Sequence, residues 1–360
     1  MIYILNFFAV FVYYFFVKVL CKNKGIKDKC FGIIVSVHAI LFRILSNPFD
    51  FADTMRYADA YTEISDFSFQ EVAFSFHEYT VWGQGYAIIN WLISRLSLDY
   101  NYYFVIIGLF ITGGTMWFYR KTSYSLLLTA TLFFLYPMLY LMSFAVLRQH
   151  IAAVVVLIAL YNINNYKISI PLSLFAPLIH TSAIVFIPFF LWRKIKLSNS
   201  NPTKIIIYML IGIILLRILV GVVLGYLSTL LMSERNASFA DEGDNLNIIP
   251  VIILGILVVT ILWEKIFTKC RNIDLEIIKF LLYGFLISIF GIGLSGAGRL
   301  TIFFLYVVPI ASTYLIHYAQ RYRLMNQLCI FFILIIFLRQ MYYMHSSWVL
   351  DFSYNFIWNK

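Results

Sequence analysis

Three polar side chains in succession, Arg148, Gln149 and His150, interrupt an otherwise apolar stretch, SFAVLRQHIAA. A charged side chain at the centre of a bilayer costs roughly 3 kcal/mol on insertion scales, so an ionisable residue there is a functional candidate by default. We place Arg148 at the outer end of its helix, where the planar guanidinium could hold a phosphate through two parallel hydrogen bonds. The alternative for Arg148 is snorkelling toward water or an ion pair at the helix end.

His180 lies deep in another apolar run, PLIHTSAIVF, beside Thr181 and Ser182. Imidazole takes or gives a proton near pH 7 without a large pKa shift, so His180 is a candidate acid or base. The alternative is a structural histidine that hydrogen-bonds a backbone carbonyl.

Several arginines also lie within or beside apolar runs. Arg299, in LSGAGRLTIFF, follows small residues that allow close backbone approach, and it offers a second phosphate contact. Arg217, in IILLRILVG, lies mid-span and requires a partner or a wet cavity, for structural or functional reasons. Arg43, Arg95 and Arg339 lie near span ends and are expected to snorkel.

The segment FDFADTMRYADAY interleaves carboxylates with aromatic rings. Carboxylates accept hydrogen bonds from sugar hydroxyls, and rings stack on the C–H faces of sugars. The segment is therefore either a sugar-binding loop or an ordinary solvated loop, and its candidate residues are Asp50, Asp53, Arg56, Tyr57, Asp59 and Tyr61. The chain has no HExxH, Walker-type or GxSxG motif, and its four cysteines show no metal-ligand spacing, so we expect no metal or cofactor.

The composition indicates the environment in which helices must position these residues. Of the 360 residues, 62% are hydrophobic and 12% are charged, about half the charged share of a soluble domain. The chain must therefore be solvated by a lipid bilayer. Its net charge of +10 comes from short basic clusters between apolar runs, as the positive-inside rule expects, and these form no patch with interleaved aromatics. We expect no binding to nucleic acid.

These features predict an all-α polytopic membrane protein with about 10–12 transmembrane helices. The clear spans are about 2–20, 31–47, 102–119, 124–143, 145–163, 204–227, 248–267, 277–296, 300–318 and 327–344. Residues 86–98 are short for a span. Residues 168–191 contain three prolines and could form one span or two half-helices that turn near His180.

The basic clusters can all face the cytoplasm if 86–98 is interfacial or re-entrant and 168–191 is a broken hairpin. Treating both as full spans gives twelve helices but moves Arg120, Lys121 and Lys167 outside, so we prefer the first arrangement. Both arrangements place the termini outside. We expect a single transmembrane domain, 1–360, with a sizeable external loop between the second and third hydrophobic segments. The external loops, about 46–85 and 228–247, hold 11 of the 17 acidic residues.

The polar residues together form an ordered series that resembles the EpsG-like branch of the Wzy-type polysaccharide polymerases. The matching positions are Asp53, Thr54 and Tyr57; Gly85, Tyr86 and Asn90; Leu147, Arg148, Gln149 and Ala152; His180, Ser182 and Ala183; and Gly298 and Arg299. Gln84 departs from the pattern, since an acidic residue or proline is more usual before the Gly-Tyr pair.

The resemblance implies a glycosyltransferase that uses no nucleotide sugar. It would transfer a growing glycan from undecaprenyl diphosphate onto a lipid-linked repeat unit, at the external face of a bacterial inner membrane. Arg148 and Arg299 would hold the diphosphate, and His180 or Asp53 would act as base. Arg56 and Tyr57 would position sugar. Gln149 and Arg217 are further candidates for substrate binding.

The implied partners are an undecaprenyl-diphosphate-linked oligosaccharide and the bilayer, and a chain-length regulator is left open. The alternatives are another lipid-linked glycosyltransferase, an O-antigen ligase, or a flippase for lipid-linked oligosaccharide. A flippase would be expected to show internal repeats, which we do not find. A membrane acyltransferase would show a histidine-centred signature, and His38 lies in no such context.

Overall fold

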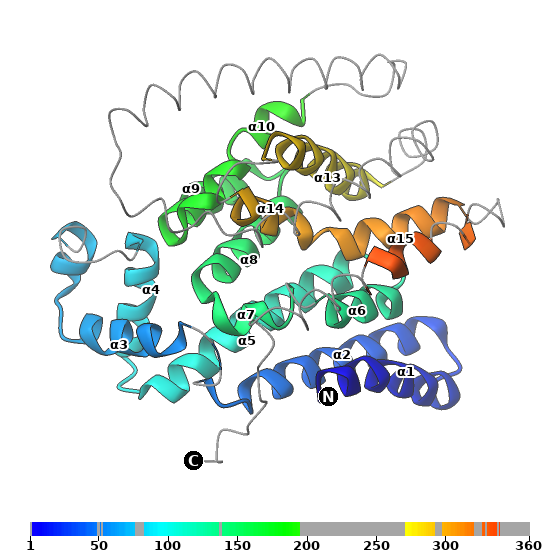
Figure 1. Cartoon of the computed structure of the whole chain (residues 1–360), viewed down its shortest axis with the longest axis horizontal. Helices are drawn as coiled ribbons and strands as arrows, with labels where there is room; N and C mark the ends of the chain where they lie inside the picture. Colours follow the sequence, from blue (N-terminus) through cyan, green and yellow to red (C-terminus); the bar gives the residue numbers. More distant parts are fainter. Residues whose placement is uncertain are drawn as a thin grey trace. The chain divides into compact units, whose positions relative to one another are not determined.

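The computed structural model describes residues 2–48, 51, 53–75, 83–136, 139–194, 271–291 and 297–319, with short pieces at 326–327, 330–336 and 338. Every regular element in these ranges is a helix, which confirms the all-α prediction (Figure 1). Arg217, Arg339, the predicted spans at 204–227 and 248–267 and the predicted loop at 228–247 lie outside the described residues.

The chain divides into two compact units, one within residues 1–187 and from 334 onward, the other within 188–333. The helices of the first unit are α1 (Ile2–Leu20), α2 (Lys24–Ile44), α3 (Thr54–Ser65), α4 (Gln84–Ser94), α5 (Tyr100–Thr122), α6 (Leu126–Leu135), α7 (Met142–Ala145), α8 (Leu147–Tyr161) and α9 (Tyr166–Ile179), with the short π-helix η2 (Glu71–Ser75) and the 3₁₀-helix η4 (Thr181–Phe186).

The second unit contains α10 (Phe189–Trp192), α13 (Asn272–Gly291), α14 (Ala297–Leu305) and α15 (Val308–Ala319). An ion pair joins α13 to the residue that follows α10: Arg193 Nε lies 3.0 Å from Glu276 Oε2, and both side chains are nearly buried. The rings of Phe189 and Phe280 pack edge to face with centroids 5.1 Å apart. Polar and aromatic contacts therefore hold α10 against α13.

Polar side chains that accept backbone N–H groups begin three helices of the first unit. Asn23 accepts from Gly25 N at 2.9 Å and starts α2. Asp99 accepts from Asn101 N at 2.9 Å and starts α5, and the Ser125 hydroxyl caps α6. Asn, Asp and Ser are the preferred residues at this position because they satisfy N–H groups that have no partner within the helix.

The lengths of the helices bear on the predicted spans. In the described part of the chain, α5 is the one helix long and apolar enough to cross a membrane, and Arg299–Leu305 with Val308–Tyr318 passes the same test as a pair bent by 43°. The predicted span 124–143 is wrong in extent, because α6 ends at Leu135. Tyr136 precedes Pro137, and the residue before a proline is driven out of helical conformation.

The chain is interrupted at His180, as in the broken arrangement preferred from the sequence, although Pro171 and Pro177 lie inside α9 and not at the break. Helix α9 ends at Ile179, His180 is extended with φ −147° and ψ 120°, and η4 begins at Thr181. The break places the imidazole at the junction between α9 and η4. The ring accepts a hydrogen bond from the backbone N–H of Ser182 in η4.

Helix α5 packs against both α2 and α8, and adjacent glycines on it meet these two neighbours differently. A Cβ added at Gly114 would lie 2.5 Å from Val154 Cγ1 of α8, which is far inside van der Waals contact. A Cβ added at Gly113 would lie 3.8 Å from Ile40 Cδ1 of α2, an ordinary contact. The close approach of α5 to α8 therefore depends on Gly114.

We predict that Gly114→Ala destabilises the protein by roughly 1–3 kcal/mol through overpacking against α8. Gly113→Ala is the matched control, because it gains the same helix propensity, about 1 kcal/mol, without a clash. Thermal unfolding of both purified variants in detergent measures the difference. Equal melting temperatures would contradict close packing at Gly114.

Candidate active site

The N-terminal end of α3 presents a carboxylate that the helix does not use. Asp53 adopts a left-handed conformation with φ 65°, and its side chain makes no capping hydrogen bond to α3. The turn is closed instead by the Thr54 hydroxyl, which donates to the carbonyl of Phe51 at 2.6 Å. Asp53 Oδ1 lies 3.6 Å from Arg56 Nη1, and both side chains are exposed. The Asp53–Arg56 pair therefore faces outward from the helix start.

Helix α8 carries Arg148 to the same place. Arg148 hydrogen-bonds the hydroxyl of Tyr57 on α3, and its Cζ lies 5.9 Å from the centre of the Tyr86 ring on α4. The rings of Tyr57 and Tyr86 meet edge to face at 5.9 Å. Burial raises the pKa of Tyr57, and nearby Asp53 raises it further, while Arg148 opposes both effects. Three helices distant in sequence thus converge on one partly exposed guanidinium.

Further tyrosines pack against Tyr86 on the side of the protein interior. The Tyr86 and Tyr103 hydroxyls lie 2.5 Å apart, and both side chains are fully buried. The Tyr103 ring stacks on Tyr61 with centroids 4.6 Å apart, and the Tyr61 hydroxyl donates to the carbonyl of Leu98 at 2.8 Å. We call Tyr57, Tyr61, Tyr86 and Tyr103 the tyrosine cluster. It joins α3 to both α4 and α5, and α3 lies next to α4 in Figure 1.

The three polar residues predicted at the start of α8 occupy its first turn. The chain turns at Val146, with φ −96° and ψ 63°, and Leu147 begins the helix. Arg148 is partly exposed, whereas Gln149 is 4% exposed and His150 is fully buried. His150 lies within electrostatic range of Arg43 and His180. Arg148 is therefore the member of the trio that reaches the surface.

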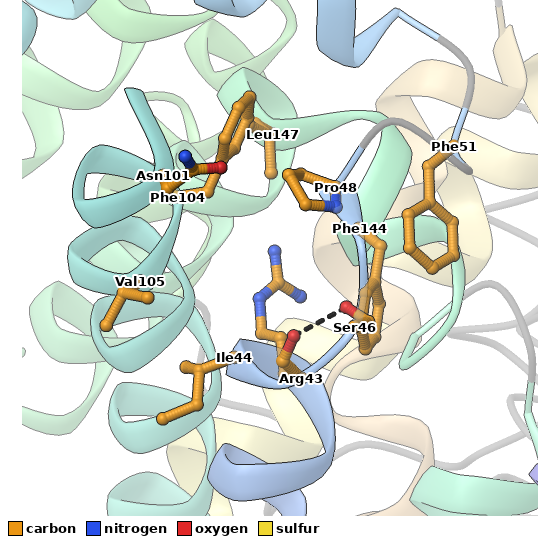
Figure 2. A pocket seen from close by; sticks show the side chains of 10 residues that line it. All are labelled: Arg43, Ile44, Ser46, Pro48, Phe51, Asn101, Phe104, Val105, Phe144 and Leu147. Carbon is orange, nitrogen blue, oxygen red and sulfur yellow. Dashed lines mark hydrogen bonds between the residues drawn. The ribbon is translucent and has the colours of Figure 1, made fainter. Parts of the chain in front are cut away.

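Arg43 does not snorkel, contrary to the prediction: it is 5% exposed. Its guanidinium donates to the hydroxyl and the carbonyl of Ser143 and lies 4.5 Å from the centre of the Phe144 ring. Figure 2 shows the side chain projecting toward Pro48 and Leu147. These residues line a small cavity with a volume of about 20 Å³. The guanidinium stays inside because the protein supplies hydrogen-bond acceptors and an aromatic face there.

Room for Arg43 comes from Gly108 on α5, where an added Cβ would lie 3.0 Å from Arg43 Cδ. By contrast, Arg95 is exposed and lies over the Trp91 ring at 4.9 Å. Arg43 fixes α7 to α2 through Ser143, and α7 leads directly into the turn that presents Arg148. Arg43 is thus a positioning residue that the sequence analysis missed, because nothing in the sequence showed Ser143 or Gly108 beside it.

The hydrogen bonds of His180 define its tautomer. Nδ1 accepts the backbone N–H of Ser182 at 3.4 Å, and it lies 2.6 Å from the Ser182 hydroxyl oxygen. A ring nitrogen that accepts an N–H carries no proton itself, so the contact with the Ser182 N–H favours the neutral tautomer that holds its proton on Nε2. In that tautomer Nε2 is a hydrogen-bond donor.

Two glycines bring the start of α4 against the backbone that precedes His180. A Cβ at Gly83 would lie 2.5 Å from the carbonyl oxygen of Leu178, and one at Gly85 would lie 2.9 Å from the Leu178 carbonyl carbon. Only glycine fits both positions, so the Gly-Tyr pair places Tyr86 close to the α9 break. Gln84 donates to the carbonyl of Ala73 and ties α4 to η2, which gives this unusual residue a structural role.

The structure thus gathers Asp53, Arg56, Tyr57 and Arg148 in the first unit. His180 lies at the α9 break, which packs against the start of α4. Arg299 is exposed near the start of α14 in the second unit. Within the described ranges, no three His, Cys, Asp or Glu side chains gather to form a possible metal site.

A family model described as the EpsG family matches residues 33–356, which covers the whole of this site. The chain belongs to the EpsG family. Neither a curated protein nor a solved structure matches it. Membership confirms the resemblance seen in the sequence and associates the chain with polysaccharide biosynthesis. Together with the apolar helices it indicates a membrane protein.

We predict that Arg43→Met lowers the free energy of unfolding of this EpsG-family protein by roughly 2–4 kcal/mol, because buried acceptors at Ser143 lose a charged partner. Arg95→Met removes the same group from an exposed site and should cost less than about 1 kcal/mol. Thermal unfolding in detergent compares the two variants. Similar losses would show that Arg43 does not anchor α7.

Proposed function

We propose that this protein is a multi-pass polysaccharide polymerase of the bacterial inner membrane, with its active site on the external face. It transfers a growing glycan from undecaprenyl diphosphate onto a lipid-linked repeat unit. Family membership supports the reaction class. The observation that carries the proposal is the partly exposed Arg148, which Tyr57 and Tyr86 hold in the first turn of α8 beside the exposed Asp53.

In the proposed reaction a hydroxyl oxygen of the acceptor attacks the anomeric carbon of the donor glycan. The bond between that carbon and the diphosphate oxygen breaks, and the diphosphate leaves with the bonding electrons. The hydroxyl proton passes to a base. Because the leaving group is already activated, the protein has three tasks: neutralising the diphosphate, orienting the hydroxyl and accepting one proton.

Arg148 is suited to the first task. Negative charge on the diphosphate grows as the bond breaks, so a fixed cation stabilises the transition state more than the ground state. The first turn of α8 adds N–H groups that have no helical partner and the positive end of the helix dipole. The tyrosine cluster and Arg43 fix the position of this turn. Arg299 is exposed near the start of α14 in the second unit, and its role as a second phosphate contact stays a prediction from the sequence.

The hydrogen bonds of His180 favour Asp53 as the base. Ser182 contacts Nδ1, and its N–H favours the neutral tautomer with the proton on Nε2, so we assign His180 as a donor. In our proposal His180 donates from Nε2 to an oxygen of the substrate. Asp53 has no capping bond to α3, and its exposed carboxylate can accept the proton of the acceptor hydroxyl.

The remaining candidates for substrate binding differ in how far their side chains are buried. Arg56 is well exposed and is the proposed sugar contact on α3. Tyr57 is 4% exposed and hydrogen-bonds Arg148, so we assign it to positioning Arg148 instead of stacking on sugar. Gln149 is also buried, and its position favours support of the α8 start over direct binding.

We predict that Arg148→Ala lowers the rate of polymer formation by about 10²–10³-fold, the usual cost of removing one group that stabilises transition-state charge. Arg148→Lys should retain part of the rate, because it keeps the charge but loses the planar fork. Arg95→Ala is the control. Purified protein with defined lipid-linked repeat units gives the measurement, and full polymerisation by Arg148→Ala would overturn the proposed site.

Two substitutions distinguish a donor from a base at His180. Gln places an amide N–H near the position of Nε2, whereas the shorter Asn places its amide near Nδ1 and does not reach the position of Nε2. If His180 donates from Nε2, His180→Gln should polymerise about tenfold faster than His180→Asn, in line with the loss of one hydrogen bond to a charged group. Equal loss of activity in both variants, at matched melting temperatures, would assign the base to His180.

A further inference from the structure

A large basic cavity lies in the first unit, formed by residues of α1, α2, α5 and the start of α6. Its volume is about 710 Å³. Lys27 and Lys29 reach it from α2, and Arg120 and Lys121 reach it from the end of α5. Asp28 is the acidic residue among those that line it. The beginning of α2 and the end of α5, which lie at the same end of this helix pair, thus contribute four cations to one space.

Helix stability does not explain all of these charges. Arg120 and Lys121 lie in the last turn of α5, where cations complement the negative end of the helix dipole. Lys27, however, lies in the first turn of α2, which contains no acidic residue, and a cation there opposes the dipole. The positive-inside rule requires basic residues in this loop but does not require them to line a cavity.

Aromatic side chains make the same cavity amphipathic. Trp117, Tyr14 and Tyr124 line it beside the basic residues. Lys27 Nζ lies 5.9 Å from the centre of the Tyr14 ring, so cation and ring form one surface. Trp and Tyr gather at the boundary between headgroups and acyl chains, where one end of the side chain is apolar and the other is wet. This combination fits a ligand that joins an anionic group to a hydrocarbon chain.

The position of Arg120 depends on a glycine of the facing helix. A Cβ added at Gly32 of α2 would lie 3.0 Å from Arg120 Nε and 2.9 Å from Leu126 Cδ2. Arg120 therefore runs closely along α2 toward the cavity because residue 32 has no side chain.

We propose that this cavity binds the phosphate headgroup of an anionic membrane lipid, with Lys27 and Arg120 as the principal phosphate contacts. We expect each cation that contacts the phosphate to contribute about a fivefold change in affinity, which is the order found for a basic residue near an anionic membrane surface. The guanidinium of Arg120 offers paired donors to the phosphate oxygens, and the ammonium of Lys27 adds a point charge. The aromatic residues contact the glycerol and the upper acyl chains. The site is separate from the residues proposed for glycan transfer.

The test uses the purified full-length protein in an uncharged detergent. Phosphatidylglycerol and, separately, phosphatidylcholine are titrated, and native mass spectrometry counts bound lipid. The test variant is Lys27→Ala/Arg120→Ala. The matched control is Lys18→Ala/Lys22→Ala, which removes the same charge from exposed positions at the end of α1 and just before α2 that do not line the cavity. A third variant, Gly32→Ala, keeps every charge but displaces Arg120.

We expect the wild-type protein and the control to bind phosphatidylglycerol alike. The cavity double variant should bind about 25-fold more weakly, which corresponds to about fivefold for each charge. Gly32→Ala should give an intermediate loss at an unchanged melting temperature. Equal weakening in the cavity variant and the control, or equal affinity for both lipids, would overturn the proposal. Displacement of phosphatidylglycerol by millimolar inorganic phosphate would assign the cavity to free phosphate and overturn the lipid as its ligand.

Discussion

The guanidinium of Arg148 is the point on which the first unit converges. Tyr57 of α3 accepts its hydrogen bond, and the Tyr86 ring of α4 lies beneath it, although these helices are separated from α8 by long stretches of sequence. A charge among apolar helices is tolerated only where specific groups surround it. The tyrosine cluster and the small residues that permit close packing can be understood as the surroundings that this one charge requires.

Arg43 shows the same principle in a fully buried form. Its hydrogen bonds to Ser143 connect α2 with the short helix that leads into the Arg148 turn. Arg43 is thus hydrogen-bonded within the protein and connects two helices, whereas Arg148 is held by its neighbours and is partly exposed. This difference in burial separates positioning from binding more clearly than residue type does, since the two side chains are chemically identical.

Much of this organisation was predictable from sequence. Apolar length predicted α5, the prolines near His180 predicted the break after α9, and the cost of charge in an apolar setting singled out Arg148. Other features depend on contacts between distant segments. The burial of Arg43 requires Gly108 and Ser143, and the Tyr86–Tyr103 pair is hidden among 26 tyrosines. The early end of α6 shows that hydropathy does not register how strongly a proline limits the residue before it.

The left-handed backbone of Asp53 has a consequence for how its chemistry can be dissected. At φ 65° most side chains incur a steric cost, whereas asparagine and glycine are accommodated readily. Replacement by alanine would remove the carboxylate and also introduce a steric cost at the positive φ. The measured loss of activity would then combine both effects. Asparagine preserves the shape of the turn and isolates the missing negative charge, which makes it the informative substitution at this residue.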